Sequence, residues 1–516
     1  MNAIDKALER PWAILFLVLF LAYYQVFSLE PVDSDTANAL LAAQDMAAGN
    51  WRLHGWFMAP DNYLGLDEVS YGVVWRLTNN ICLTLRLVPA LQWAGLVLIA
   101  ARLAAGPKFS LHSFMVLTVI IAIPVFTPIT EHLYFQAPFH ILTMICILLS
   151  VILCERMIKD DRTHWLWTGL FAFITADASF SDPFFQYILT FPLLLALWMS
   201  GAVMRKRIAL LYFLCVACGM LLLRLNVETG GFSQPLTNLP KTTSIYDVLA
   251  EILGVARACL CILGCIPLGD QPLPLIFSLL RVPLILLLLM SLLHCARRFR
   301  RLKFMDLCLL LIVGANFGAV IVTKSMAEAS PQRFLLPAWI CAAILAAKFS
   351  RKDVVITGYC SIIAGLAIGG CILKLMQTPG NDVRFSPGEA NYIAALESRG
   401  LTRGYAGYWQ ASDTTVASDG KIRVATLIRG KDGKLIPYRW FSKQDWYGGD
   451  ASAKRFFVST SVDPVWPTPQ TIVATFGKPD DMLVTSLGDS NKTNIITYVY
   501  NRPLPAVRVA VGQELP

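Results

Sequence analysis

Residues that can move protons or bind phosphate gather in a few short segments between long apolar runs. They are Asp33, Asp35, Glu131, His132, His140, Lys324 and Arg333. Carboxylates and imidazoles exchange protons with hydroxyl groups, and the guanidinium fork of arginine binds phosphate oxygens through two hydrogen bonds. The same types also have structural uses: Asp35 could cap a helix expected over residues 36–48, and Arg333 could extend from a helix end towards water.

The first polar segment continues into a mixture of polar and aromatic residues that includes His54, Asp61, Tyr63 and Asp67. Trp and Tyr are common where a membrane meets water, so these positions also suit interfacial anchors. Asp177 and Asp182 close a later turn and could line the same cavity. The Asp182-Pro183 pair is also a typical helix start, and that interpretation is favoured.

The elements between these segments are apolar and predict a membrane protein. Of 516 residues, 15% are charged and 56% are hydrophobic, with a mean hydropathy of +0.56; soluble proteins have about 25% charged residues. About eleven runs are long enough to cross a bilayer, at residues 11–29, 81–105, 111–128, 138–155, 165–180, 183–203, 208–225, 274–295, 304–322, 334–348 and 354–375. Residues 246–268 form either an interfacial or re-entrant helix or a twelfth span.

Basic clusters between the runs predict the orientation of the chain. They occur at residues 156–162, 205–207, 297–303 and 348–352, which alternate with segments poor in Lys and Arg. These clusters and the N-terminus are expected in the cytoplasm, so the net charge of +9 does not indicate nucleic-acid binding. The thirteen cysteines lie almost wholly within the apolar runs, which favours packing over disulfides or metal binding.

The tail over residues 377–516 is richer in charge and predicts a water-soluble α/β domain with a mainly antiparallel sheet. Ser386-Pro387-Gly388-Glu389 is a capping box, and it predicts a helix over residues 390–399 that stops at Gly400. Asp432-Gly433 predicts a hairpin between strands at residues 421–428 and 435–441. Further strands are expected at residues 455–460, 471–476 and 494–500. Residues 405–409 are either a carbohydrate-facing aromatic cluster or part of the core.

Three motifs in this order resemble the GT-C glycosyltransferases, which include protein O-mannosyltransferases, aminoarabinose transferases and O-antigen-modifying transferases. In that family an acidic residue follows the first membrane helix and precedes juxtamembrane helices, as Asp33-Ser34-Asp35 does here. Glu131 matches an acidic residue of the second outer loop, and residues 333–337 match an Arg-aromatic-x-x-Pro motif. A proline-rich stretch of the aminoarabinose branch is replaced by residues 67–71, which leaves the branch open.

The resemblance implies a mainly α polytopic membrane protein, with a catalytic part over residues 1–376 and a periplasmic α/β domain over residues 377–516. It implies inverting transfer of one sugar from a polyprenyl-phosphate donor to a hydroxyl of an envelope glycan or lipid, such as lipopolysaccharide or its O-antigen. The expected location is a bacterial inner membrane. No nucleic-acid partner is expected.

The same resemblance assigns roles to the candidate residues. Asp33 would be the general base, with Asp35 and Glu131 as further catalytic residues. The donor phosphate would be bound by Arg333, Lys324, His132 and His140, and the acceptor by His54, Asp61, Tyr63 and Asp67. No cofactor is expected: the several carboxylates leave a divalent metal open, but no ligand spacing indicates one, and cationic side chains can stabilise the departing phosphate without a metal.

Three alternatives stay open at the level of the sequence. A lipid-linked glycan polymerase or ligase would use the same donors and transfer a whole oligosaccharide. A lipid or solute transporter would place polar residues near the middle of the membrane, whereas here they gather at the outer rim. A non-catalytic envelope scaffold would bind through its tail.

Overall fold

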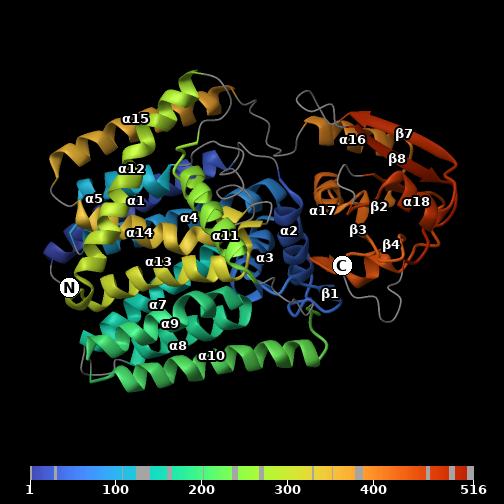
Figure 1. Cartoon of the computed structure of the whole chain (residues 1–516). Coiled ribbons are helices and arrows are strands. Elements are labelled where there is room, and N and C mark those ends of the chain that lie inside the picture. The colour runs from blue at the N-terminus through green and yellow to red at the C-terminus, as the bar shows by residue number, and fades with distance from the viewer. Residues whose placement is uncertain are drawn as a thin grey trace.

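The computed structural model describes residues 3–27, 32–106, 108–123, 140–159, 165–201, 203–234, 242–266, 272–327, 331–350, 353–377, 387–460, 465–486 and 494–507. Helices from the first three-quarters of the chain form a bundle (Figure 1). The C-terminal residues form an α/β domain beside one end of this bundle.

The bundle is made of α1 (Ala3–Val26), α4 (Ile81–Ala105), α5 (Leu111–Leu117), α7 (Ile141–Lys159), α8 (Trp165–Ser181), α9 (Pro183–Ser200), α10 (Arg205–Glu228), α11 (Ile245–Ile262), α12 (Pro272–Arg297), α13 (Phe304–Val322), α14 (Leu336–Phe349) and α15 (Val354–Gln377). Helix α14 lies at its centre, where every residue from Leu336 to Ala347 is buried. Its many alanines let neighbouring helices approach closely.

Within the described residues, eight helices are long and apolar enough to cross a membrane. They are α4, α7, α9, α10, α12, α13, α14 with the turn before it, and α15. The chain is therefore a membrane protein, but the expected count of about eleven spans is not reached by this measure. The apolar parts of α1 and of α5 with π-helix η2 (Thr118–Ala122) are shorter, and α8 has 17 residues.

Helix α11 lies in the run that the sequence left undecided between an interfacial helix and a span. It begins with a capping box formed by Ser244 and Asp247. The helix packs against α13 and against the 3-10 turns η4 (Ser325–Ala327) and η5 (Pro331–Leu335). It is not among the eight spanning helices.

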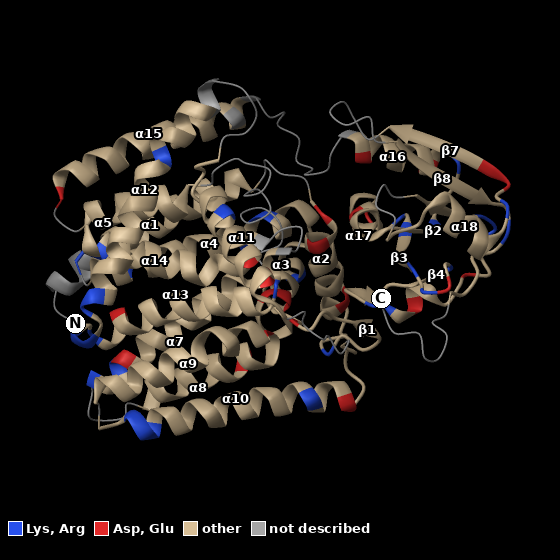
Figure 2. Ribbon diagram, in the orientation of Figure 1, with Lys and Arg blue, Asp and Glu red and all other residues tan. Residues whose placement is uncertain are grey.

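Lys and Arg residues gather at the end of the bundle that lies away from the α/β domain (Figure 2). Arg156 and Lys159 end α7, Arg205 begins α10, and Lys348 near the end of α14 forms an ion pair with Asp306. The basic clusters thus share one end, as the sequence predicted, while the assignment of that end to the cytoplasm stays a prediction.

The α/β domain contains a six-stranded sheet, in the order β4 (Leu435–Pro437), β3 (Arg423–Arg429), β2 (Arg403–Ala406), β6 (Phe456–Ser459), β8 (Asn494–Tyr500) and β7 (Asp481–Ser486). Its helices are α16 (Pro387–Ser398), α17 (Tyr408–Ala417) and α18 (Pro469–Phe476). The three central strands β3, β2 and β6 are parallel, and the outer pairs are antiparallel. The sheet predicted as mainly antiparallel therefore has a parallel centre.

Local signals in the tail predicted five of these nine elements, gave no prediction for β2, α17 and β7, and were wrong at α18. The hairpin at Asp432-Gly433, the helix ending before Gly400 and the strand at residues 494–500 are present, although Ser386 of the predicted capping box lies outside the described residues. Residues 471–476, predicted as a strand, belong to α18. Thr468 and Thr471 form a capping box around Pro469, and these signals start a helix.

The loop between α1 and α4, which the sequence analysis expects outside the membrane and which is called the outer loop below, joins the two parts of the molecule. It contains α2 (Ser34–Ala47), β1 (Trp56–Phe57), the π-helix η1 (Leu64–Glu68) and α3 (Val69–Thr78). Strand β1 pairs with β5 (Ser442–Lys443) of the α/β domain, and α2 packs against α17. In Figure 1, α2 and β1 lie between the bundle and the domain.

Candidate functional site

The π-helix η1 is held against the C-terminal end of α8. Tyr63, just before η1, has a φ of 52°, and its backbone N–H donates to the carbonyl of Ser181 at 2.9 Å. The N–H of Gly65 donates to Ser181 Oγ at 2.9 Å. A left-handed conformation is uncommon for a bulky residue, and π-helices are frequent at functional sites, so η1 marks the region where polar side chains converge.

Four side chains from three segments of the chain form one hydrogen-bonded network beside η1. His140 Nδ1 lies 2.8 Å from Asp182 Oδ2, and His140 Nε2 lies 3.2 Å from the hydroxyl of Tyr63. The Tyr63 hydroxyl donates to Asp61, whose Oδ2 lies 3.8 Å from His140 Nε2. Thr143 donates to Asp182 Oδ2 at 2.6 Å. The network can therefore pass or share protons among two carboxylates, a phenol and an imidazole.

The electrostatics of the network depend on its burial. Burial raises the pKa of Asp61, although the nearby charge of His140 opposes the effect. Burial and the charge of Asp61 raise the pKa of Tyr63 well above its ordinary value. Burial favours neutral His140, but the charge and hydrogen bond of Asp182, with the charge of Asp61, outweigh it and raise the pKa of His140.

Arg333 is the cation that acts on this network, since its charge lowers the pKa of both Tyr63 and His140. It is exposed, and its guanidinium lies 4.9 Å from the ring centroid of Phe334. The Phe334 ring in turn lies 6.4 Å from that of His140. The arginine of the predicted phosphate-binding motif and the histidine at the head of α7 therefore belong to one site.

Asn316 of α13 holds the backbone of this motif. Its side-chain N–H donates to the carbonyl of Phe334 at 2.8 Å, and its Oδ1 accepts from the N–H of Ala338 at 3.0 Å. Pro337 lies between them at the start of α14. Asn316 is fully buried, and it satisfies backbone groups that the break between η5 and α14 would otherwise leave unpaired.

Two further carboxylic acids are buried within η1. Asp67 accepts from Gln92 of α4 at 3.0 Å, and burial raises the pKa of Asp67 to about 8. Burial and the charge of Asp67 raise the pKa of Glu68 well above its ordinary value. Among the described residues, neither oxygen of Glu68 has a hydrogen-bond partner. Asp67, predicted to contact the acceptor, is fully buried here.

Asp33 and Asp35 lie where α2 contacts the α/β domain. Asp33 caps α2 by accepting from the N–H of Thr36 at 2.8 Å, so the cap predicted at Asp35 is at Asp33. Asp35 accepts instead from the hydroxyl of Tyr408 on α17. Burial, followed by the charges of Glu389 and Asp33, raises the pKa of Asp413 well above its ordinary value. Asp33, the predicted general base, therefore lies near the carboxyl group of Asp413.

The other predicted residues have different surroundings. His54 Nδ1 lies 2.6 Å from the carbonyl of Gly230, just beyond α10. Lys324 forms an ion pair with Asp247 of α11 at 2.9 Å. Among the described residues, neither side chain forms a hydrogen bond or ion pair with the network around His140. Glu131 and His132 lie outside the described residues.

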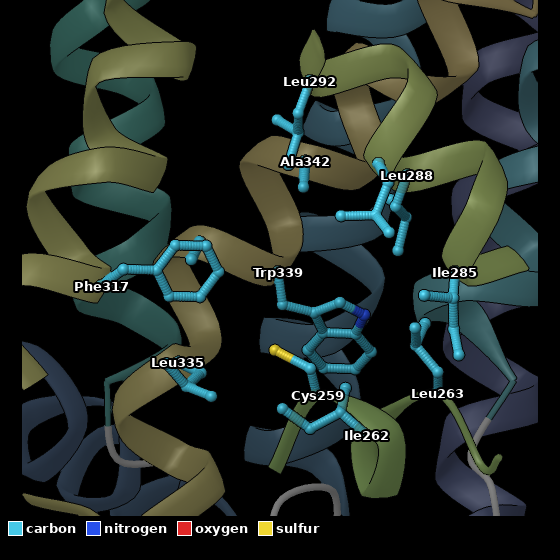
Figure 3. Close-up of a pocket in the computed structure, with 12 residues that line it drawn as sticks. Cys259, Ile262, Leu263, Ile285, Leu288, Leu292, Phe317, Leu335, Trp339 and Ala342 are labelled. Carbon is cyan, nitrogen blue, oxygen red and sulfur yellow. The ribbon is translucent and has the colours of Figure 1, made fainter. Parts of the chain in front are cut away.

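An apolar cavity of about 130 Å³ lies between α11, α12, α13 and α14. Figure 3 shows Trp339 in the cavity, with Phe317 on one side and Leu288 and Ile285 on the other. Leu335, two residues after Arg333, also lines it. The cavity thus begins next to the cationic motif and continues among apolar side chains.

Predicted aromatic residues of the tail form part of its core. Tyr405 is fully buried, and the Tyr408 ring lies 6.1 Å from that of Trp466. Only Trp409, with 49% of its surface exposed, is available for other contacts. In the part of the chain that the structure describes, no group of three or more His, Cys, Asp or Glu residues is arranged to hold a metal ion.

The sequence analysis weighed Asp182 as a cavity residue but favoured its helix-start use, and it assigned no role to Glu68. Asp182 does cap α9 by accepting from the N–H of Phe184 at 2.9 Å, as Asp182-Pro183 predicted, but its second oxygen binds His140. One carboxylate thus has both uses. The available signal for Glu68 was the acidic pair Asp67-Glu68 between the apolar residues Leu66 and Val69, since ionisable residues in apolar surroundings are often functional.

No protein-family model and no curated protein matches the sequence. Among solved structures, the chain is similar to ArnT from Cupriavidus metallidurans bound to undecaprenyl phosphate, with a TM-score of 0.55 and 11% sequence identity. The match covers 95% of this chain and 98% of that one. The chain therefore has the fold of ArnT, a member of the GT-C group that the sequence motifs resemble.

Proposed function

We propose that this protein is a glycosyltransferase that moves one sugar from a polyprenyl-phosphate carrier to an acceptor hydroxyl at the outer face of the membrane. The observation that carries the proposal is the network of Asp61, Tyr63, His140 and Asp182, which lies beside Arg333 and is buried except at Asp61. The shared fold supports the same class of donor, since that ArnT structure contains undecaprenyl phosphate.

Arg333 and the apolar cavity beside it suit the two ends of such a donor. A guanidinium binds phosphate oxygens through charge-assisted hydrogen bonds, and Arg333 is exposed and close to the network. Leu335 and Trp339 line the apolar cavity that would take part of the polyprenyl chain. Arg333 would stabilise the negative charge that develops on the departing phosphate.

The transfer needs a base on the side of the acceptor. The acceptor oxygen would form a bond to the anomeric carbon while the bond from that carbon to the phosphate oxygen breaks. The electron pair of the breaking bond would leave with the polyprenyl phosphate. A carboxylate would take the acceptor proton. Inversion follows because attack and departure occur on opposite faces of the sugar.

Two carboxylates are candidates for this base. Asp33 is the one expected from the family resemblance. Asp61 is favoured by its position, because its side chain is 31% exposed and its raised pKa makes the carboxylate a stronger base. Tyr63 and His140 would position Asp61 and stabilise its changing charge.

The test is mass spectrometry of envelope lipids and glycans from cells that carry the wild-type chain, D33N, D61N, R333A or no copy, at matched protein levels. A product one sugar heavier is expected only where the enzyme is active. Asn keeps the volume of Asp but removes the base, so the true base variant should lose at least about 100-fold in product.

The matched control is D419N, the same substitution at a residue of the α/β domain that has no assigned role. Asp419 has a φ of 54°, a conformation that Asn tolerates. Its product should equal that of the wild type. If the product gained a whole oligosaccharide, the protein would be a polymerase or ligase. If the wild type altered no mass, the proposed function would be wrong.

A further inference from the structure

A second cavity, of about 520 Å³, lies between α8, α10 and the outer loop. Helices α8 and α10 lie side by side at the edge of the bundle (Figure 1). They approach closely at Gly219, where a Cβ atom would lie 2.3 Å from the carbonyl oxygen of Ala176. The cavity is therefore formed by a tightly packed pair of helices and covered by Arg52 and Leu64 of the outer loop.

The lining of this cavity is apolar away from the outer loop and mixed near that loop, where Phe180, Leu225 and Leu64 accompany the polar residues. Phe173 and Leu222 lie further from the outer loop along α8 and α10. Of their surfaces, 69% and 50% are exposed at the edge of the bundle, where a membrane protein faces lipid. Asp177, Asn226 and Thr229 lie nearer the outer loop. An occupant that matches this lining has an apolar tail in the membrane and a polar head at its outer surface.

The polar end offers an acceptor of hydrogen bonds. Arg52 is already held by Asn226 and Thr229, with its Nε 3.0 Å from Asn226 Oδ1. The Asp177 carboxylate lines the cavity and has no hydrogen bond or ion pair to any described residue. It lies against Gly65, where a Cβ would be 2.0 Å from Asp177 Oδ1. A headgroup that donates hydrogen bonds, such as a sugar with free hydroxyls, complements it.

The cavity lies next to residues that adjoin the catalytic network, although none of the four network residues lines it. Leu64 is a wall of the cavity and directly follows Tyr63. Asp177 lies on α8, and Asp182 directly follows the end of that helix. The five residues between these two positions correspond to about 7.5 Å along a helix axis. A headgroup of one or two sugars spans that length.

We infer that this cavity binds the acceptor, and that the acceptor is a membrane lipid with a hydroxyl-bearing headgroup that enters sideways between α8 and α10. The inference rests on the proposed function, because it names the acceptor of that reaction. Donor and acceptor then reach the network from different sides, the donor beside α11 to α14 and the acceptor beside α8 and α10.

The experiment uses the full chain in detergent with a photoreactive alkyl glucoside that carries a diazirine in its alkyl chain. After irradiation, labelled peptides are identified by mass spectrometry. Labels are expected around Phe173 and Leu222. L222W should reduce labelling at least about five-fold by filling the cavity, and D177N should weaken binding of the probe about three- to ten-fold.

The control is L221W, because Leu221 is at the same level of α10 and 56% exposed but does not line the cavity. It should label and transfer sugar like the wild type, whereas L222W should lose most transfer. Equal labelling or equal transfer in L222W and L221W would overturn the inference and leave the proposed function standing. Specific labelling without sugar transfer by the wild type would overturn the proposed function and, with it, the acceptor role.

Discussion

His140 Nδ1 lies 2.8 Å from Asp182 Oδ2, and both side chains are almost completely removed from solvent. This contact joins the head of α7 to the start of α9, and His140 Nε2 then faces Tyr63 and Asp61 of the outer loop. Three segments distant in sequence thus share one proton-carrying network.

Replacing Asp182 by Asn should separate its structural use from its chemical use. Asn caps helices as well as Asp does, so the contact with the N–H of Phe184 is kept. The charge that orients His140 and raises its pKa is lost. We expect a loss of sugar transfer of about ten-fold or more, with a thermal midpoint within a few degrees of the wild type. A thermal midpoint lowered by more than a few degrees together with the loss of sugar transfer would contradict a chemical role for Asp182.

Arg333 and Lys324 should differ in their effect on donor use, although the sequence assigned both to the donor phosphate. R333A removes the cation next to the network and should raise KM for the polyprenyl-phosphate donor at least about ten-fold. Lys324 is engaged with Asp247, so K324A should change KM less than about two-fold. Steady-state kinetics over a range of donor concentrations measures both, and equal effects would contradict the placement of the phosphate at Arg333.

Asn316 should matter for stability through its two backbone contacts. N316L keeps the approximate volume but leaves the carbonyl of Phe334 and the N–H of Ala338 without their partner. Each unsatisfied buried group costs about 1–3 kcal/mol. Thermal unfolding in detergent should show a lower midpoint, and N316D, which keeps the acceptor for Ala338, should show an intermediate one.

Asp67 should make the stability depend on pH. Its pKa is about 8 in the folded protein against 3.8 ordinarily, so the folded state holds an extra proton between these values. Stability should then fall as pH rises from about 4 to 8 and level off above that. D67N mimics the neutral acid and should flatten this dependence. Thermal midpoints of both proteins at pH 5, 7 and 9 test the sign, and parallel curves would contradict it.

Short-range signals in the sequence predicted the helices and much of the α/β domain. The apolar runs set the spanning helices because a bilayer admits few other backbone conformations, and Asp432-Gly433 set its hairpin through local turn geometry. The failure at residues 471–476 has a local cause as well. Residues 471–476 are a short, mainly apolar run, a pattern that strands and helices share, and the capping box at Thr468 and Thr471 decided for the helix.

The sequence by itself determined that the chain is a membrane protein, that polar residues gather at one end of its helices, and that Arg333 and His140 are candidates for chemistry. Only the tertiary structure decided which of them meet. It joined His140 to Asp182, buried Asp67, placed Asp33 and Asp35 against α17, and paired Lys324 with Asp247. The reason is physical: a residue type and its spacing depend on a few neighbours, whereas a contact between α7, α9 and the outer loop depends on how the whole bundle packs.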